Sequence, residues 1–211
     1  MSYVFSGWWH FAAAMAFAVA FGTLAHADPT FYLRQVAFTL PLLIGSSALF
    51  FVPDKWARKG ALKFLHYPLP DWDMLLLGPA SHRNWLSHSP VLPMLLLGAA
   101  LKWTTLASFR PFSALLLGTC LGIGSHLFWD CVGSARHKIV FVPYWFALRE
   151  AMSRLWLLGG AVICLCIAWS WESARPGTFD SGFVNGFAHE LVSRFVESVL
   201  SAFARAQKLG L

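Results

Sequence analysis

Residues 111–132 read PFSALLLGTCLGIGSHLFWDCV, an apolar run whose only histidine and only charged residue, His126 and Asp130, lie near its end. An α-helix of roughly 20 residues spans the hydrocarbon core of a bilayer, so this run is long enough to cross a membrane. Four further stretches have the same character: residues 8–25, 36–52, 91–106 and 155–171. We therefore predict an all-α, polytopic membrane helix bundle with about five spanning helices.

The composition of the whole chain supports a membrane protein. Its 211 residues are 57% hydrophobic and only 12% charged, and the mean hydropathy is +0.58. A soluble domain carries about 25% charged residues, which is roughly what a water-exposed surface requires. The 11 tryptophans fit the same prediction, because indole rings collect at the headgroup level of membranes.

The positive charges indicate contact with lipid rather than nucleic acid. The formal net charge is +6, but the basic residues lie in short loops between apolar runs. Such placement is typical of loops that stay in the cytoplasm next to anionic headgroups. Two loops hold most of them: Lys55, Arg58, Lys59, Lys63 and Arg83 in one, and Arg136, Lys138, Arg149 and Arg154 in the other. We expect both loops on the cytoplasmic side, membrane lipids as partners, and no nucleic-acid partner.

The chain beyond residue 175 differs from the rest. Apolar residues recur there near helical spacing, from Phe183 to Phe203, with charged residues between them. This pattern predicts an amphipathic C-terminal helix that lies on a membrane or against a protein partner. We accordingly divide the chain into a membrane-embedded domain, residues 1–175, and an amphipathic segment, residues 176–211.

Histidine and aspartate residues form four candidate groups for chemistry. They are His10 at the start of the first apolar stretch, the Asp71 and Asp73 pair, the His82 and His88 pair, and the His126 and Asp130 pair. His126 and Asp130 are four residues apart, so they share a helix face, and Gly122 and Gly118 continue that face. Small residues there would let a second helix approach closely. Each group alone also has a simpler interpretation: a hydrogen bond between helices, solvated loop acids, or interfacial histidines.

The charge distribution places all of these groups at one membrane face. With five spans, the basic loops put His10, the loop residues and the end of the fourth span on the cytoplasmic side. Imidazole and carboxylate ligands suit zinc, with manganese or iron as alternatives. We predict a divalent metal centre of one to three ions held by His10, Asp71, Asp73, His82, His88, His126 and Asp130.

In these motifs the sequence resembles a family of bacterial inner-membrane metal-dependent hydrolases. The pattern of that family is an early His, then Pro-Asp-x-Asp, then His-Arg-Gly-x-x-His-Ser, then Ser-His-x-x-x-Asp. Here the matching residues are His10, residues 70–73, residues 82–89 and residues 125–130, within a resemblance that spans about residues 8–145. The chain departs from the pattern at Asn84, where the family has Gly, and its second histidine is one residue further along. More distantly, the pattern is similar to zinc-dependent phospholipases C.

The resemblance implies a multi-pass enzyme of the bacterial inner membrane that cleaves a phosphoester of a lipid or other amphipathic substrate with a metal-activated water. Asp73 is our candidate general base, and the planar fork of Arg83 could orient a phosphate.

Two other functions remain open. One is a non-catalytic subunit of a membrane complex with a structural or vestigial metal site, for which the Phe-rich tail would provide the contact. The other is a transporter that uses intramembrane His and Asp. Residues 36–52, 91–106 and 155–171 contain no Asp, Glu or His, which argues against a transport path.

Overall fold

A computed structural model describes residues 3–47, 64, 66–133 and 138–174 of the chain. It divides into two compact units, Met1–Ala168 and Trp169–Leu211. All the predicted metal ligands belong to the first unit. The predicted amphipathic helix of residues 176–211 lies outside the described residues.

The described part of the chain is mostly helical. In chain order the elements are α1 (Tyr3–His26), α2 (Val36–Ser46), η1 (Leu69–Asp71), α5 (Trp72–Leu77), η2 (Pro79–Ser81), α6 (Val91–Lys102), α7 (Thr104–Ser108), α8 (Arg110–Gly133), β1 (Val140–Val142), β2 (Phe146–Ala147) and α9 (Glu150–Ser173). Three segments are long and apolar enough to cross a membrane: Gly7–His26, Arg110–Gly133 and Glu150–Ser173. They cover three of the five stretches predicted to span.

The other two stretches form shorter apolar helices among the described residues. Residues 36–52 give α2, which ends at Ser46 because Ser47 is extended (φ −138°, ψ 148°); residues 48–52 lie outside the described part. Residues 91–106 break after Lys102, where Trp103 is extended (φ −115°, ψ 94°) and separates α6 from α7. Pro90 precedes the first residue of α6, in keeping with proline's preference for helix starts.

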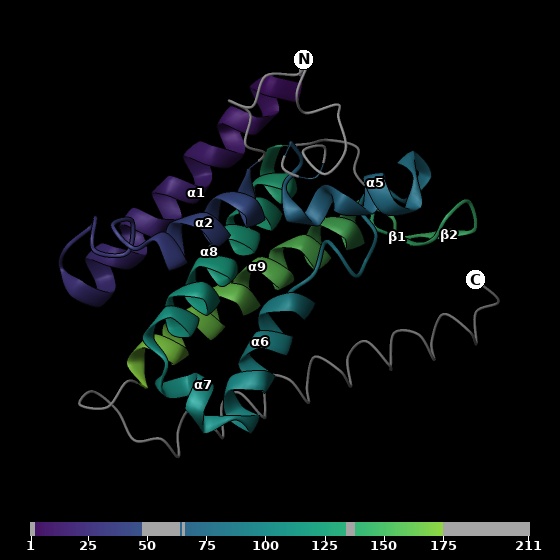
Figure 1. Ribbon diagram of the computed structural model, residues 1–211. Coiled ribbons are helices and arrows are strands. Elements are labelled where there is room, and N and C mark those ends of the chain that lie inside the picture. Colours follow the sequence, from purple (N-terminus) through teal and green to yellow (C-terminus); the bar gives the residue numbers. More distant parts are fainter. Residues whose placement is uncertain (1–2, 48–63, 65, 134–137, 175–211) are drawn as a thin grey trace. The chain divides into compact units, whose positions relative to one another are not determined.

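Helix α8 is the centre of the first unit. Figure 1 shows it running between α2 and α9. On the α9 side, a buried cluster contains Ile123 and Leu127 from α8 and Leu157 and Ala161 from α9. These apolar contacts fix the helix that carries His126 and Asp130.

Glycines bring α2 directly against α8, on the face where the sequence predicts the close approach of a second helix. A Cβ atom on residue 122 would lie 2.7 Å from the carbonyl oxygen of Leu42, and one on residue 118 would lie even closer to the Phe38 carbonyl. Only glycine leaves room for backbone contact at this distance. The contact places the C-terminal end of α2 beside the last turns of α8.

A short β-hairpin is an addition to the predicted all-α architecture. Strands β1 and β2 pair antiparallel, with Val140 opposite Ala147 and Val142 opposite Phe146. The base of the hairpin is fixed to α9, because the Ile139 N–H donates to Ser153 Oγ at 2.9 Å. The strands have three and two residues, which is too short for an alternation of apolar and polar residues to be recognised in the sequence.

Candidate metal centre

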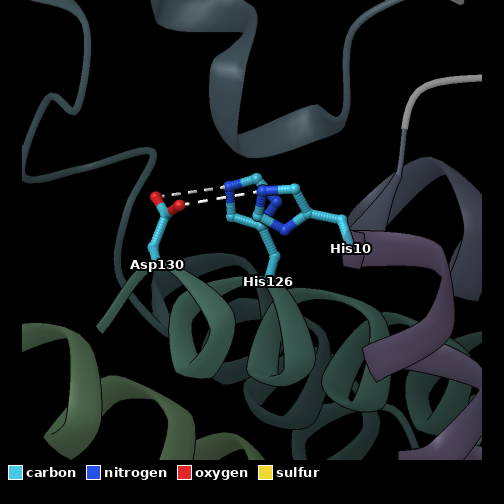
Figure 2. Close-up of side chains that lie close together, drawn as sticks. All are labelled: His10, His126 and Asp130. Atoms are coloured by element: carbon cyan, nitrogen blue, oxygen red, sulfur yellow. Dashed lines mark ion pairs between the residues drawn. The ribbon is translucent and has the colours of Figure 1, made fainter. Parts of the chain in front are cut away.

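Four separate parts of the chain bring buried histidines and aspartates together. Helix α1 contributes His10, η1 ends with Asp71, the loop after η2 contributes His88, and α8 contributes His126 and Asp130 one turn apart. Figure 2 shows His10, from α1, and His126 facing the Asp130 carboxylate. The glycine contact between α2 and α8 leaves this end of α8 enclosed by neighbouring segments.

Two imidazole nitrogens and two carboxylate oxygens form a compact set. His88 Nε2 lies 3.4 Å from Asp71 Oδ1 and 3.6 Å from Asp130 Oδ2. His126 Nε2 lies 3.8 Å from Asp71 Oδ1 and 3.7 Å from Asp130 Oδ2. In a tetrahedral zinc site with bonds of 2.0–2.2 Å, neighbouring ligand atoms are about 3.4 Å apart. All four N–O separations are close to that value, which is compatible with a cation bound by atoms of this set.

His10 extends the cluster on the α1 side. Its Nε2 lies 3.7 Å from Asp130 Oδ1, and its ring stacks on that of His126 with centroids 4.3 Å apart. Within the described residues, two groups have ligand atoms mutually within 4.8 Å: His10, His126 and Asp130, and Asp71, His88 and His126. His126 belongs to both, and its Nε2 can bind only one ion.

Backbone contacts orient both central histidines. His126 Nδ1 lies 3.2 Å from the Ser46 carbonyl oxygen. A carbonyl can only accept, so Nδ1 carries the proton and the lone pair is on Nε2, toward the aspartates. The carbonyl of His88 accepts a 2.9 Å hydrogen bond from the indole Nε1 of Trp156 in α9. Neither His88 Nε2 nor His126 Nε2 has a hydrogen-bond partner among the described residues, which is the state expected of ligand atoms.

Asp73 and His82 lie at the edge of the cluster. Asp73 Oδ2 accepts hydrogen bonds from the Asn84 N–H (2.6 Å) and Ser87 Oγ (2.7 Å), so this oxygen holds the loop that carries His88. His82 is only partly buried, and its Nδ1 lies 3.7 Å from Asp73 Oδ1 and 3.8 Å from Asp71 Oδ1. The structure thus gathers all seven predicted ligands, but Asp73 and His82 are outside the two three-residue groups.

Arg83 clamps Asp130. Its Nε donates to Asp130 Oδ2 at 3.0 Å and its Nη2 to Oδ1 at 3.2 Å, and both side chains are buried. Arg83 itself has a left-handed backbone (φ 64°), an uncommon conformation for a residue with a side chain. Nη1 is buried and has no hydrogen-bond partner in the described part of the chain. Two of the three guanidinium nitrogens therefore hold the aspartate, and one remains available.

The electrostatics of the loop residues favour a cation between them. Burial opposes ionisation of Asp71, but the nearby imidazoles of His88, His126 and His82 hold the pKa of this carboxyl well below its usual range. Burial also disfavours a charged His88, yet the carboxylates of Asp71 and Asp73 raise the pKa of His88 to about 9. The carboxylates thus attract a positive charge to the place where a metal ion would lie.

Three groups that hold the cluster in place were not predicted from the sequence: the Ser46 carbonyl, the Ser87 hydroxyl and the Trp156 indole. The Ser46 carbonyl could not have been predicted, because every residue has a backbone carbonyl. Ser87 lies beside His88 in the motif and could have been singled out, whereas Trp156 is one of 11 tryptophans in an apolar chain.

Comparisons of the chain with protein-family models, with curated proteins and with solved structures found no match. The resemblance to membrane hydrolases therefore stays a prediction from the motifs, and what can be said of function depends on the geometry of the cluster.

Proposed function

We propose that this chain is a membrane-embedded, metal-dependent hydrolase that cleaves a phosphoester of a lipid or another amphipathic substrate. The observation that carries the proposal is the four-atom set of His88, His126, Asp71 and Asp130, with N–O separations of 3.4–3.8 Å. Burying histidines and aspartates inside an apolar helix bundle is costly, so their presence by default suggests a function. We place the protein in the bacterial inner membrane, in several passes, with the cluster at the cytoplasmic face.

The donor set fits a divalent cation. Asp71, His88 and His126 form one of the two three-residue groups, the one we assign to the ion. Zinc is the first choice for two imidazoles with a carboxylate, ahead of manganese or iron. Catalytic zinc sites keep three protein ligands and one open position. When bound, such an ion lowers the pKa of water and polarises a phosphoryl oxygen.

The protein's own groups complete the site. Asp130, fixed in its plane by Arg83, faces the three-residue group and can accept a hydrogen bond from an attacking water. Arg83 Nη1 is a donor available to a phosphate oxygen, as the sequence suggests for this residue. Asp73 Oδ2 holds the loop through two hydrogen bonds, whereas its Oδ1 is buried and has no hydrogen-bond partner among the described residues, so Asp73 keeps one oxygen for the general-base role.

One feature favours the non-catalytic alternative. If Asp130 Oδ2 binds the ion as a fourth protein ligand, it closes the tetrahedron, as in structural zinc sites. The site would then hold α8 and the 82–88 loop together within a subunit of a larger complex. The two proposals make different predictions for Asp130.

The test uses the full-length protein purified in detergent and reconstituted in phospholipid vesicles. We expect bound metal by elemental analysis and release of a phosphorylated product from the vesicle lipids. His126→Ala and Asp71→Asn should lose both, whereas His26→Gln, in α1 but outside the cluster, should keep both. Asp130→Asn should keep metal and lose turnover. Loss of metal in Asp130→Asn, with no turnover by the unaltered protein on any phospholipid supplied, would instead establish a structural site.

A further inference from the structure

The tip of the β1–β2 hairpin, residues 142–145, exposes large apolar and aromatic side chains. Tyr144 is 92% exposed, Trp145 90% and Val142 49%. Figure 1 shows the hairpin projecting from the start of α9, away from the helices. Two nearly fully exposed aromatic rings side by side are unusual on a surface that meets only water.

The position of the hairpin along the chain sets its level relative to a membrane. It lies between the end of α8 at Gly133 and the start of α9 at Glu150, both of which are candidate spans. The segment that joins two spans emerges where they leave the hydrocarbon, which is the headgroup layer. Tyr and Trp are the residues enriched in that layer, because each ring has an apolar body and a polar group.

Charge at the base of the hairpin matches anionic headgroups. Lys138 precedes β1 and Arg149 follows β2, and both are exposed. The nearest acidic residue, Glu150, is paired with Arg154 at 3.1 Å, so it does not offset these charges. Basic residues next to exposed aromatic rings favour binding to a negatively charged lipid surface.

The base of the hairpin is joined to the loop that forms the metal centre. The Val140 N–H donates to the Arg83 carbonyl and the Trp85 N–H donates to the Val140 carbonyl, each at 3.0 Å. The Trp85 and Phe141 rings stack with centroids 5.7 Å apart. The base of the hairpin is therefore fixed to the residue that clamps Asp130.

From these observations we infer that the hairpin tip is a lipid-binding element that inserts Tyr144 and Trp145 into the headgroup layer beside the cluster. The occupant of this surface is an anionic phospholipid bilayer. The inference depends on the hairpin and the flanking spans, and it holds whether or not the cluster is catalytic.

Tyrosine labelling gives a direct test, because the chain has only four tyrosines. The full-length protein is labelled with 3-fluorotyrosine and reconstituted in nanodiscs of phosphatidylglycerol and phosphatidylcholine, and the Tyr144 ¹⁹F signal is assigned from its absence in Tyr144→Phe. A gadolinium chelate on the lipid headgroup should broaden this signal severalfold more than that of Tyr32, which is 1% exposed. A water-soluble chelate at equal bulk concentration should broaden it less.

A variant shows whether the tip itself makes the contact. Trp145→Ser should reduce the broadening of Tyr144 by the lipid chelate severalfold, while Trp103→Ser, at a 52% exposed tryptophan between α6 and α7, should leave it unchanged. Strong broadening by the soluble chelate alone would put the tip in water. Broadening by neither chelate would show that protein covers it. Either result overturns the inference.

Discussion

At the scale of single residues, the two central histidines differ in how they are held. A backbone carbonyl at the end of α2 fixes the tautomer of His126, whereas the His88 ring contacts the Ser87 hydroxyl through Nδ1 and its backbone carbonyl accepts from the Trp156 indole. Groups that orient a metal ligand typically affect metal affinity by 10–100-fold when they are removed. Trp156 is therefore a positioning residue, and its effect can be measured apart from that of the ligands.

Trp156→Phe tests this role. The substitution removes the indole N–H but keeps an aromatic ring in the core, so we expect the fold to persist. Zinc affinity should fall by about tenfold, because the backbone at His88 loses its fixed position. Titration of the purified protein with zinc against a competing chelator measures the change, and Trp103→Phe serves as the matched control. If the zinc affinity of Trp156→Phe is unchanged, the indole only packs in the core and does not position His88.

Residue type had to be combined with spacing, loop charge and the motif resemblance to predict the seven candidate ligands, since the chain has four other histidines and three other aspartates. It could not predict what each one does. Asp71 and Asp73 look equivalent in the sequence, yet the turn from η1 into α5 directs one into the cluster and the other onto the Asn84 N–H and the Ser87 hydroxyl. Likewise, the pairing of Arg83 with Asp130 joins residues 47 positions apart, and no local pattern reports such a contact.

At the scale of elements, the glycines of α8 determine where α2 lies and so where the Ser46 carbonyl meets His126. The sequence predicted this close approach, because Gly118 and Gly122 share the face of His126. It did not predict that the neighbour would be α2, since glycine spacing identifies the approached face and not the approaching helix. The boundary between α6 and α7 was missed because residues 91–106 are mostly apolar and were treated as one stretch, although Lys102 and two threonines flank Trp103, where the backbone extends.

Gly122→Ala should therefore act on both packing and the site. The added Cβ would lie 2.7 Å from the Leu42 carbonyl, so α2 must move away, at a cost of about 1–3 kcal/mol in the free energy of unfolding. The movement should also lower metal affinity, because the Ser46 carbonyl moves with α2. Gly98→Ala in α6 is the control: nothing lies within 4 Å of its Cβ position, so helix stability should rise slightly. Thermal unfolding and zinc titration of both variants distinguish these outcomes.

The hairpin predicts a difference between substrates if the protein is the proposed hydrolase. Replacing Tyr144 and Trp145 together with Ser should slow cleavage of phospholipid in vesicles by about tenfold, because the interfacial contact is lost. Cleavage of a water-soluble chromogenic phosphodiester should be unchanged, since that substrate needs no membrane contact. Equal losses on the two substrates would show that the substitutions damage the metal centre instead.

At the scale of the whole molecule, the cluster joins parts of the chain that share no continuous element. Its five buried members come from four places: α1, η1, α8 and the loop that precedes α6. They therefore span residues 10 to 130. Without a cation, the buried Asp71 and Asp130 carboxylates depend on neighbouring imidazoles and on Arg83 for compensating charge, in a region of low dielectric where burying charge is costly. A bound ion would therefore cross-link these segments in addition to any role in catalysis.

Removing the metal should accordingly destabilise the entire first unit. A ligand that binds only the folded state contributes about 2.7 kcal/mol when its free concentration is 100 times Kd. At about 2–4 °C per kcal/mol for a chain of this size, EDTA should lower the unfolding temperature by about 5–10 °C, and added zinc should restore it. His126→Ala should unfold at the lower temperature with or without EDTA, because it has no cation to lose. If the unaltered protein and His126→Ala respond to EDTA equally, the ion lies elsewhere and the cluster is held together by its hydrogen bonds and packing alone.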